Sequence, residues 1–248
     1  MPHPVARVAG CGGIQTAPPT TASEVVRGQR RGDRMRTAIL GTGVVGQALG
    51  KAFITLGHEV KMGSREAKNE KALAWAKEMG PKASAGTFAD AAAFAEIVVL
   101  ATLGVANESA LTAAGAANLR GKILIDTTNP LDHAGGGPPQ LAVSGNDSGG
   151  ERVQRLMPEA LVVKAFNTVG APQMFRPSFA DGRPDMFICG NNADARKKVA
   201  GLLGDFGWGV VDIGGIEGSR YLEAMCIAWV LAGIHGNNWN IAFKLLRK

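Results

Sequence analysis

The chain of 248 residues is poor in aromatic residues, in charged residues and in cysteine. Phe, Trp and Tyr make up 6% of it, which disfavours a surface of stacked rings for binding nucleic acid. The three cysteines (Cys11, Cys189 and Cys226) lie far apart, so they predict neither a zinc cluster nor a disulfide framework. No apolar run in the sequence approaches the roughly 20 residues that cross a bilayer. We therefore expect no metal site and no membrane partner, and a reducing, cytoplasmic setting.

Positive charge is concentrated at the N-terminus. Of the net charge of +6, residues 1–36 contribute +4, from six arginines against Glu24 and Asp33, and the other 212 residues contribute +2. A near-neutral body with a basic leader does not form a basic binding face, so no nucleic-acid partner is expected. Residues 1–34 lack apolar periodicity and are predicted to be a disordered extension. A transit peptide and a start at Met35 are the alternatives.

A glycine motif follows the first predicted strand, Thr37–Leu40. A helix is predicted after the motif, from Val44 to Leu56, and a second strand from His58 to Met62. In such a GxGxxG the first glycine permits a tight turn, the second a close approach of backbone to a pyrophosphate, and the third close packing of the helix. A purely structural turn is the less favoured alternative. The motif predicts dinucleotide phosphates at Gly41, Thr42, Gly43, Val44, Val45 and Gly46.

The end of the second strand indicates which dinucleotide binds. A site for NAD usually has an Asp or Glu there to bind the ribose 2′-hydroxyl, whereas this chain has Gly63-Ser64-Arg65. Ser64 can donate a hydrogen bond and Arg65 can make a forked contact with a 2′-phosphate, with Lys68 adding charge. Glu66 is interpreted as an acidic residue at a helix start. NADP(H) is therefore favoured over NAD(H), with a solvated surface role for Arg65 as the alternative.

Strand and helix patterns alternate along the rest of the chain, which predicts a parallel sheet with right-handed crossovers. We expect an α/β fold of the Rossmann type, doubly wound, with a mainly parallel sheet of about eight strands. The predicted domains are a disordered extension (1–34), a dinucleotide-binding domain (35–170) and a small C-terminal helical extension packed on the same sheet (171–248). Gly, Pro and Ser are frequent in 130–150, which is interpreted as a flap over the site. Further strands are expected at 83–85, 97–101, 122–126, 161–166, 186–189 and 210–213, and helices at 67–79, 87–94, 107–116, 152–157, 193–206 and 219–231.

The chemistry of the site is constrained by what the sequence does not offer. There is no G-x-S-x-G motif, and Tyr221 is followed four residues later by Met225, so the Tyr-x-x-x-Lys proton-donor pair is absent. Carbonyl reduction needs a proton donor beside the hydride, but hydride transfer between two conjugated rings mainly needs the rings to be stacked in a dry slot. We therefore assign no catalytic side chain. The predicted ring pocket consists of small residues at strand ends: Thr102, Leu103, Gly104, Asn129, Pro130, Ala165 and Asn167.

Five segments in this order carry a family resemblance: the Gly41–Gly46 motif, Gly63-Ser64-Arg65, Gly121–Asp126 with Asn129-Pro130, Val163–Asn167 and Ile188-Cys189-Gly190. Together they resemble the NADPH-dependent reductases of coenzyme F420, and they are similar to the cytosolic oxidoreductase domains of STEAP metalloreductases.

That resemblance implies a hydride transfer between NADPH and a small-molecule acceptor, F420 or a flavin such as FMN or FAD, in a homodimer. It implies phosphates at Thr42 to Val45, a 2′-phosphate at Ser64 and Arg65, and nicotinamide near Thr102 and Ala165. The Gly-rich loop at 135–150 departs from the deazaflavin reductases. Without a membrane span, the metalloreductase architecture does not carry over.

Two other functions stay open. A non-catalytic NADP(H) sensor would also need no acid or base in its site. A small-molecule dehydrogenase of the hydroxyacid or imine-reducing type usually adds a long all-helical domain, whereas this chain retains strand patterns near Met186 and Val210.

Overall fold

Six parallel strands form the central sheet of the computed structural model, which describes residues 34–248. Their order is β3-β2-β1-β4-β5-β8, so the chain runs outward in one direction from β1 and then in the other from β4. Ile39 pairs with Met62 on one side and with Val99 on the other. This reversal of strand order beside β1 is the place where doubly wound sheets bind ligands. The strands are β1 (Arg36–Leu40), β2 (Glu59–Ser64), β3 (Ala83–Thr87), β4 (Ile97–Leu100), β5 (Ile123–Asp126) and β8 (Leu161–Lys164).

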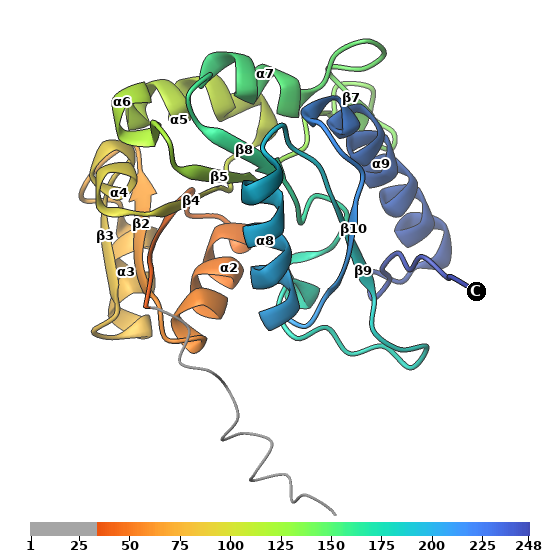
Figure 1. Ribbon diagram of the computed structural model, residues 1–248, viewed down its shortest axis with the longest axis horizontal. Coiled ribbons are helices and arrows are strands. Elements are labelled where there is room, and N and C mark those ends of the chain that lie inside the picture. The colour runs from red at the N-terminus through yellow and green to blue at the C-terminus, as the bar shows by residue number, and fades with distance from the viewer. Residues whose placement is uncertain (1–33) are drawn as a thin grey trace, which may run out of the picture. The chain divides into compact units, whose positions relative to one another are not determined.

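The two faces of the sheet carry separate hydrophobic cores. Because side chains alternate along a strand, Ile39 enters one core with Phe53 and Trp75, whereas Leu40 enters the other with Leu111. Figure 1 shows α2 and α8 on one side of the strands and α5 to α7 on the other. The first face is covered by α2 (Val44–Thr55), α3 (Glu70–Met79) and α8 (Ala193–Asp205), and the second by α4 (Phe88–Phe94), α5 (Asn107–Ala114), α6 (Ala116–Leu119) and α7 (Gly149–Leu156).

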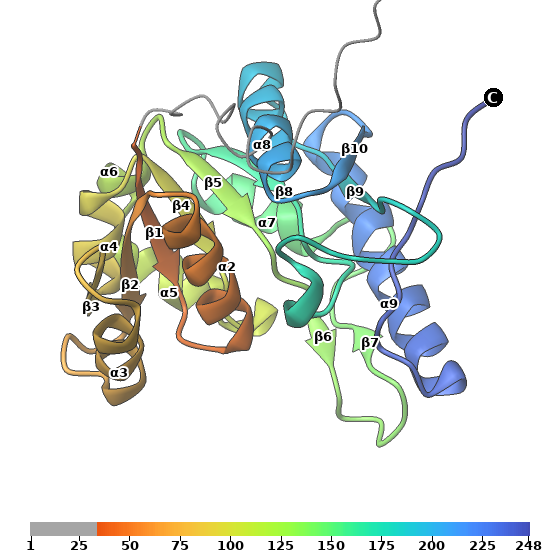
Figure 2. The same ribbon diagram turned by 90° about the horizontal axis from the view of Figure 1, so that it is seen from below.

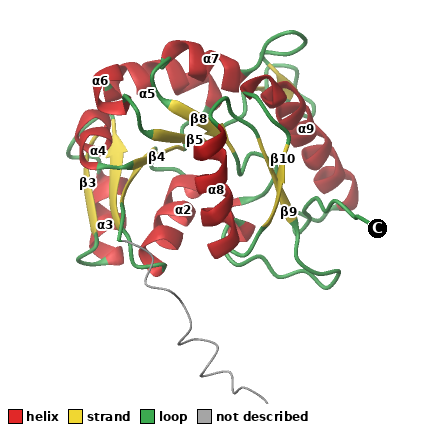
Figure 3. Ribbon diagram, in the orientation of Figure 1, coloured by secondary structure: helices red, strands yellow, loops and turns green. Residues whose placement is uncertain are grey.

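Local sequence signals explain where several helices begin and end. Thr87 and Asp90, three residues apart, form a reciprocal capping box at the start of α4. The helix expected over 107–116 is interrupted because Gly115 has φ of +85°, which ends α5 and starts the short α6. Figure 3 shows the strands of the sheet and the helices that cover them.

The strand count differs from the prediction of about eight strands in one sheet. The two strands near the C-terminus, β9 (Asp185–Ile188) and β10 (Gly209–Asp212), pair with each other in a separate two-stranded sheet. A single antiparallel bridge between Lys164 and Cys189 joins them to β8. Strand β8 pairs in parallel with β5, and its link to β9 is this antiparallel bridge, so β8 is the edge of the main parallel sheet and β9 and β10 lie outside it. The predicted boundary at residue 170 stays a prediction.

The C-terminal helix is longer than expected and only part of it is buried. Helix α9 (Ser219–Gly236) lies beside β9 and β10 in both views (Figures 1 and 2). Leu222 and Cys226 are buried, whereas the side chain of Tyr221 is 68% exposed. The tail beyond α9 packs back on it: Trp229 donates a hydrogen bond to the carbonyl of Ile241.

The glycine-rich segment 130–150 contains a small hairpin and ends in the first residues of α7. Strands β6 (Leu131–Asp132) and β7 (Gln140–Leu141) pair antiparallel, and the turn between them is exposed. Figure 2 shows the hairpin projecting away from the sheet. The sequence predicts a disordered extension at residues 1–34. Residues 1–33 of that segment lie outside the described residues. Across 34–248, no helix combines the length and the apolar character needed to cross a membrane.

Candidate active site

A cleft of about 760 Å³ lies where β1, β2, β4 and β5 end. Because these strands are parallel, their carboxyl ends and the loops that follow meet at one edge of the sheet. The cleft brings together eleven of the predicted site residues: Gly41, Thr42, Gly43, Val44, Val45, Ser64, Arg65, Thr102, Leu103, Gly104 and Asn129.

The turn after β1 requires glycine at two positions. Gly41 has φ of +131°, and a Cβ there would lie 2.3 Å from the carbonyl oxygen of Ala101. A Cβ on Gly46 would lie 2.4 Å from the carbonyl oxygen of Gly41, so Gly46 allows α2 to pack directly behind the turn and does not itself line the cleft. These contacts match the turn and packing roles that the motif predicts.

The start of α2 faces the cleft and can receive a phosphate. A Cβ built on Gly43 would meet no atom within 4 Å, so the backbone there is open to a ligand. Gly43 is the N-cap of α2 and supplies no side-chain cap, and the first turn contains no acidic residue. The N–H groups of the first turn are therefore available to an anion, and the helix dipole favours one there. The residues present fit the pyrophosphate of a dinucleotide.

The end of β2 forms the next wall of the cleft. Ser64 is buried and its hydroxyl donates a hydrogen bond of 2.6 Å to the carbonyl of Glu66, which holds the turn that presents the exposed Arg65. The hydroxyl proton of Ser64 is thus already used, and Arg65 is the cation in this wall. Lys68 is exposed and does not line the cleft, whereas Asn69, which caps α3 by accepting from the N–H of Ala72, does.

The floor of the cleft is made by the loops after β4 and β5, which touch each other. A Cβ on Gly104 would lie 2.1 Å from the carbonyl oxygen of Asn129, so only glycine permits this approach. Leu103 and Val105 stand at the rim with 76% and 68% of their surface exposed. An exposed apolar rim of this kind suits a flat, conjugated ring.

Three predicted residues lie behind or beside the cleft. Ala165 and Asn167 are buried at the end of β8, and the Asn167 amide donates to Asn129 Oδ1 at 3.0 Å and to the carbonyl of Leu222 at 2.8 Å. Asn129 returns a hydrogen bond to the carbonyl of Asn167. Asn167 therefore orients Asn129, which does line the cleft. Pro130 lines a neighbouring cavity.

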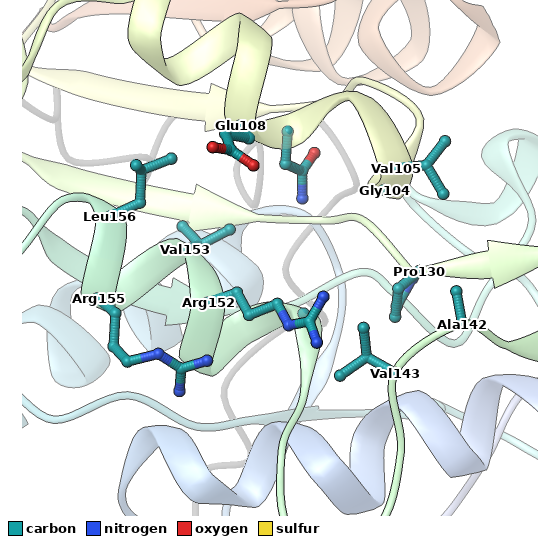
Figure 4. Close-up of a pocket in the computed structure, with 12 residues that line it drawn as sticks. Gly104, Val105, Glu108, Pro130, Ala142, Val143, Arg152, Val153, Arg155 and Leu156 are labelled. Carbon is teal, nitrogen blue, oxygen red and sulfur yellow. The ribbon is translucent and has the colours of Figure 1, made fainter.

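That neighbouring cavity has a volume of about 630 Å³ and shares Gly104 and Val105 with the cleft. Figure 4 shows Arg152 of α7 extending across it toward Pro130 and Val143. Its walls therefore combine apolar side chains with the guanidinium groups of Arg152 and Arg155 and the carboxylate of Glu108. Asp147 pairs with both Arg152 and Arg155, at 3.0 and 2.9 Å.

A buried ion cluster lies under the site. Lys164 Nζ is 2.9 Å from Asp126 and 2.8 Å from Glu223, and all three side chains are essentially inaccessible to water. Burial alone lowers the pKa of Lys164, but the two carboxylates outweigh it and hold that pKa above its ordinary value. Glu223 also accepts from the N–H groups of Gly149 and Gly150 at the start of α7. The cluster thus joins β5, β8, α7 and α9.

Several lining residues were not predicted. Asn69 could have been found from its place just before an amphipathic helix, where Asn is a common N-cap. Thr128 and the buried Asn107 beneath it are joined by a hydrogen bond across 21 residues, which no local pattern indicates. Of the described residues that line the cleft, Arg65 and His133 carry titratable side chains. No group of three metal-ligating side chains occurs within 34–248.

Comparison with known proteins identifies the family. Residues 36–130 match the family model described as NADP oxidoreductase coenzyme F420-dependent. An F420-dependent NADP reductase from Methanothermobacter thermautotrophicus is 31% identical over 202 residues, which cover 76% of this chain and 85% of that protein. The chain belongs to the F420-dependent NADP reductase family. Members of this family are oxidoreductases, and the resemblance and Rossmann-type fold expected from the sequence are confirmed.

Two solved structures are similar to this chain, and the first of them agrees with the family. A candidate F420-dependent NADP reductase from Arthrobacter sp. FB24 is 43% identical, with a TM-score of 0.81, and the match covers 86% of this chain and all of that one. A reductive aminase from Aspergillus terreus in complex with NADPH is 21% identical with a TM-score of 0.60, covering 82% of this chain and 62% of that chain. At that identity the likeness shows the fold alone.

The rat metalloreductase STEAP3 is 27% identical over 77% of this chain. The chain spans 36% of that protein, so only a part of the metalloreductase is comparable.

Proposed function

We propose that the protein transfers hydride between NADPH and a conjugated ring acceptor, a deazaflavin of the F420 type or a flavin. The observation that carries the proposal is the arrangement of the cleft. The open backbone at Gly43 faces it from α2, and Arg65 stands in the wall formed by the end of β2. These are the groups that a dinucleotide with a 2′-phosphate requires. Membership of the F420-dependent NADP reductase family supports the same nucleotide.

The roles of the chain's own residues follow from their positions. The first turn of α2 binds the pyrophosphate, and Arg65 binds the 2′-phosphate. Gly104 and Asn129 form a tight floor, while Leu103 and Val105 cover the rings and exclude water. NADPH supplies the hydride, and a ring acceptor can take its proton from solvent, so the site needs no acidic side chain.

The adjoining cavity supports a second ligand. It adjoins the cleft at Gly104 and Val105, and its apolar walls can hold the ring of an acceptor, with Arg152 and Arg155 outnumbering Glu108 among its charged lining residues. A sensor that only binds the dinucleotide would not require such a cavity. We further propose that the protein works as a homodimer in the cytoplasm; its mass in solution, measured by light scattering, reports the number of subunits.

The proposal is tested by mixing the purified protein with NADPH and, one at a time, with F420, FMN, FAD and a ferric chelate. We expect oxidation of bound NADPH in a single turnover with at least one ring acceptor, and much slower reaction with NADH. Tight NADPH binding without oxidation by any acceptor would instead favour the sensor. Reduction of a small imine or ketone in preference to a ring would favour the dehydrogenase alternative.

A further inference from the structure

A continuous hydrogen-bonded chain connects the buried ion cluster to the wall of the cleft. Asp126 Oδ2 accepts from Lys164 at 2.9 Å, and Asp126 Oδ1 accepts from the hydroxyl of Thr128 at 2.7 Å. The Thr128 hydroxyl accepts from the amide nitrogen of Asn107 at 2.7 Å. The amide oxygen of Asn107 accepts from the hydroxyl of Thr102 at 2.8 Å. The chain thus ends on Thr102, which is half-buried and lines the cleft.

The ion pair sets the direction of every bond in this chain. A carboxylate can only accept, and Asp126 is paired with the Lys164 ammonium and also accepts from the backbone N–H of Thr128 at 2.9 Å. The single hydroxyl proton of Thr128 therefore points to Asp126, and its oxygen must accept from the NH₂ group of Asn107. That orientation turns the Asn107 carbonyl toward Thr102. The proton of Thr102 is directed inward in consequence, and its oxygen presents only lone pairs to the cleft.

We infer that Thr102 is a specificity-determining residue that accepts a hydrogen bond from the nicotinamide half of NADP(H), and that Asn107 is the positioning residue that imposes this polarity. The inference rests on the proposed function, in which NADP(H) occupies the cleft. Phosphate oxygens are acceptors, so a lone pair of Thr102 repels them. With the 2′-phosphate at Arg65 after β2 and the pyrophosphate at the start of α2, the adenosine half lies on the β2 side of the cleft and the nicotinamide half extends past β4, where Thr102 lies. The donors in that half are the carboxamide NH₂ and the ribose hydroxyls. Thr102 thus discriminates between ligand donors and ligand acceptors.

Two other hydroxyls of the cleft wall show the same polarity. Ser64 donates to the carbonyl of Glu66, and Thr127 donates to the carbonyl of Leu100 at 2.9 Å. In both cases the proton is held by the protein and the oxygen alone is left for a ligand. The cleft therefore separates its functions: anion binding falls to the backbone N–H groups of α2 and to Arg65, and recognition of ligand donors falls to hydroxyl oxygens at strand ends.

The test is a calorimetric titration of the full chain and of Thr102→Val with NADP⁺ and with 2′,5′-ADP, which lacks the nicotinamide half. Valine keeps the shape of threonine but cannot accept. We expect Thr102→Val to weaken NADP⁺ binding by about 5- to 20-fold and to leave 2′,5′-ADP binding unchanged. Thr102→Ser should restore most of the loss. Thr55→Val, on the exposed end of α2, is the control for a Thr-to-Val change.

The acetylpyridine analogue of NADP⁺ distinguishes the two donors, because it lacks the carboxamide NH₂. If this analogue binds equally well to the wild type and to Thr102→Val, the carboxamide is the donor. If Thr102→Val weakens binding of the analogue as much as it weakens binding of NADP⁺, a ribose hydroxyl is the donor. Asn107→Leu tests the positioning role. The double variant that combines Asn107→Leu and Thr102→Val should bind NADP⁺ no more weakly than Thr102→Val alone, because Asn107 acts through Thr102.

Unchanged NADP⁺ binding by Thr102→Val would overturn the inference, as would an equal loss for NADP⁺ and 2′,5′-ADP. A wild-type protein that binds neither compound would instead overturn the proposed function.

Discussion

Arg65 extends from an exposed turn at the end of β2, where the Ser64 hydroxyl and the Glu66 carbonyl hold the backbone. A guanidinium in this position can form two charge-assisted hydrogen bonds with a 2′-phosphate. A 2′-hydroxyl offers it no hydrogen bond of comparable strength. The choice between the two dinucleotides is therefore expected to depend on a single side chain.

Arg65→Ala should weaken NADPH binding by about 1.5–3 kcal/mol, the contribution of a hydrogen bond to a charged group, and leave NADH binding nearly unchanged. Fluorescence titration with each dinucleotide measures both. Lys77→Ala is the control for the loss of a cation, because Lys77 is exposed on α3 and lies outside the lining of the cleft. Equal losses for NADPH and NADH would show that Arg65 does not contact the 2′-phosphate.

At the scale of elements, α7 forms one wall of the second cavity. Two different side-chain interactions stabilise its N-terminus. Ser148 caps it by accepting from the N–H of Glu151, and Asp147 accepts hydrogen bonds from Arg152 and Arg155. Burial works to raise the pKa of Asp147, but the hydrogen bonds from the two arginines prevail and lower it from 3.8 to about 2. A carboxyl whose pKa is depressed by folding stabilises the protein above its unfolded pKa and loses that contribution as the pH falls through the folded value.

Asp147→Asn should accordingly lower the free energy of unfolding at neutral pH by less than about 1 kcal/mol, since both arginines are largely exposed. The difference from the wild type should shrink as the pH falls from 3.8 toward 2. Urea unfolding at a series of pH values measures it. Asp181→Asn, at an exposed position, serves as the comparison. A difference that grows with acidity would contradict the assigned cause.

The hairpin of β6 and β7 is the other element beside the site. Leu131 and His133 line the cleft, while the glycines at its tip face solvent with nothing within 4 Å of a built Cβ. Its position agrees with the expected place of a flap, and its action as a flap stays a prediction.

At the scale of the whole molecule, the cluster of Lys164, Asp126 and Glu223 ties the C-terminal helix to the sheet. Two carboxylates and one ammonium leave a negative charge in the interior, and Glu223 is further stabilised by the first N–H groups of α7. Removing the cation leaves both carboxylates buried and unpaired, which is far more costly than removing the whole cluster.

Lys164→Met should therefore lower the free energy of unfolding by about 3–5 kcal/mol. Lys198→Met, at an exposed position on α8, should change it by less than about 0.5 kcal/mol. Urea unfolding followed by circular dichroism measures both. Combining Lys164→Met with Asp126→Asn and Glu223→Gln should recover part of the loss; no recovery would mean that the lysine stabilises by packing alone.

The sequence by itself determined the parts that depend on neighbouring residues. The glycine turn, the capping box at Thr87 and Asp90 and the apolar strands are local patterns, because backbone conformation and helix capping involve residues only a few positions apart. Only the tertiary structure decided that β9 and β10 leave the main sheet, that Asn167 supports Asn129 from behind, and that Asn107 orients Thr102. These features join residues distant in the chain, and the direction of a buried hydrogen bond depends on charges that only folding brings together.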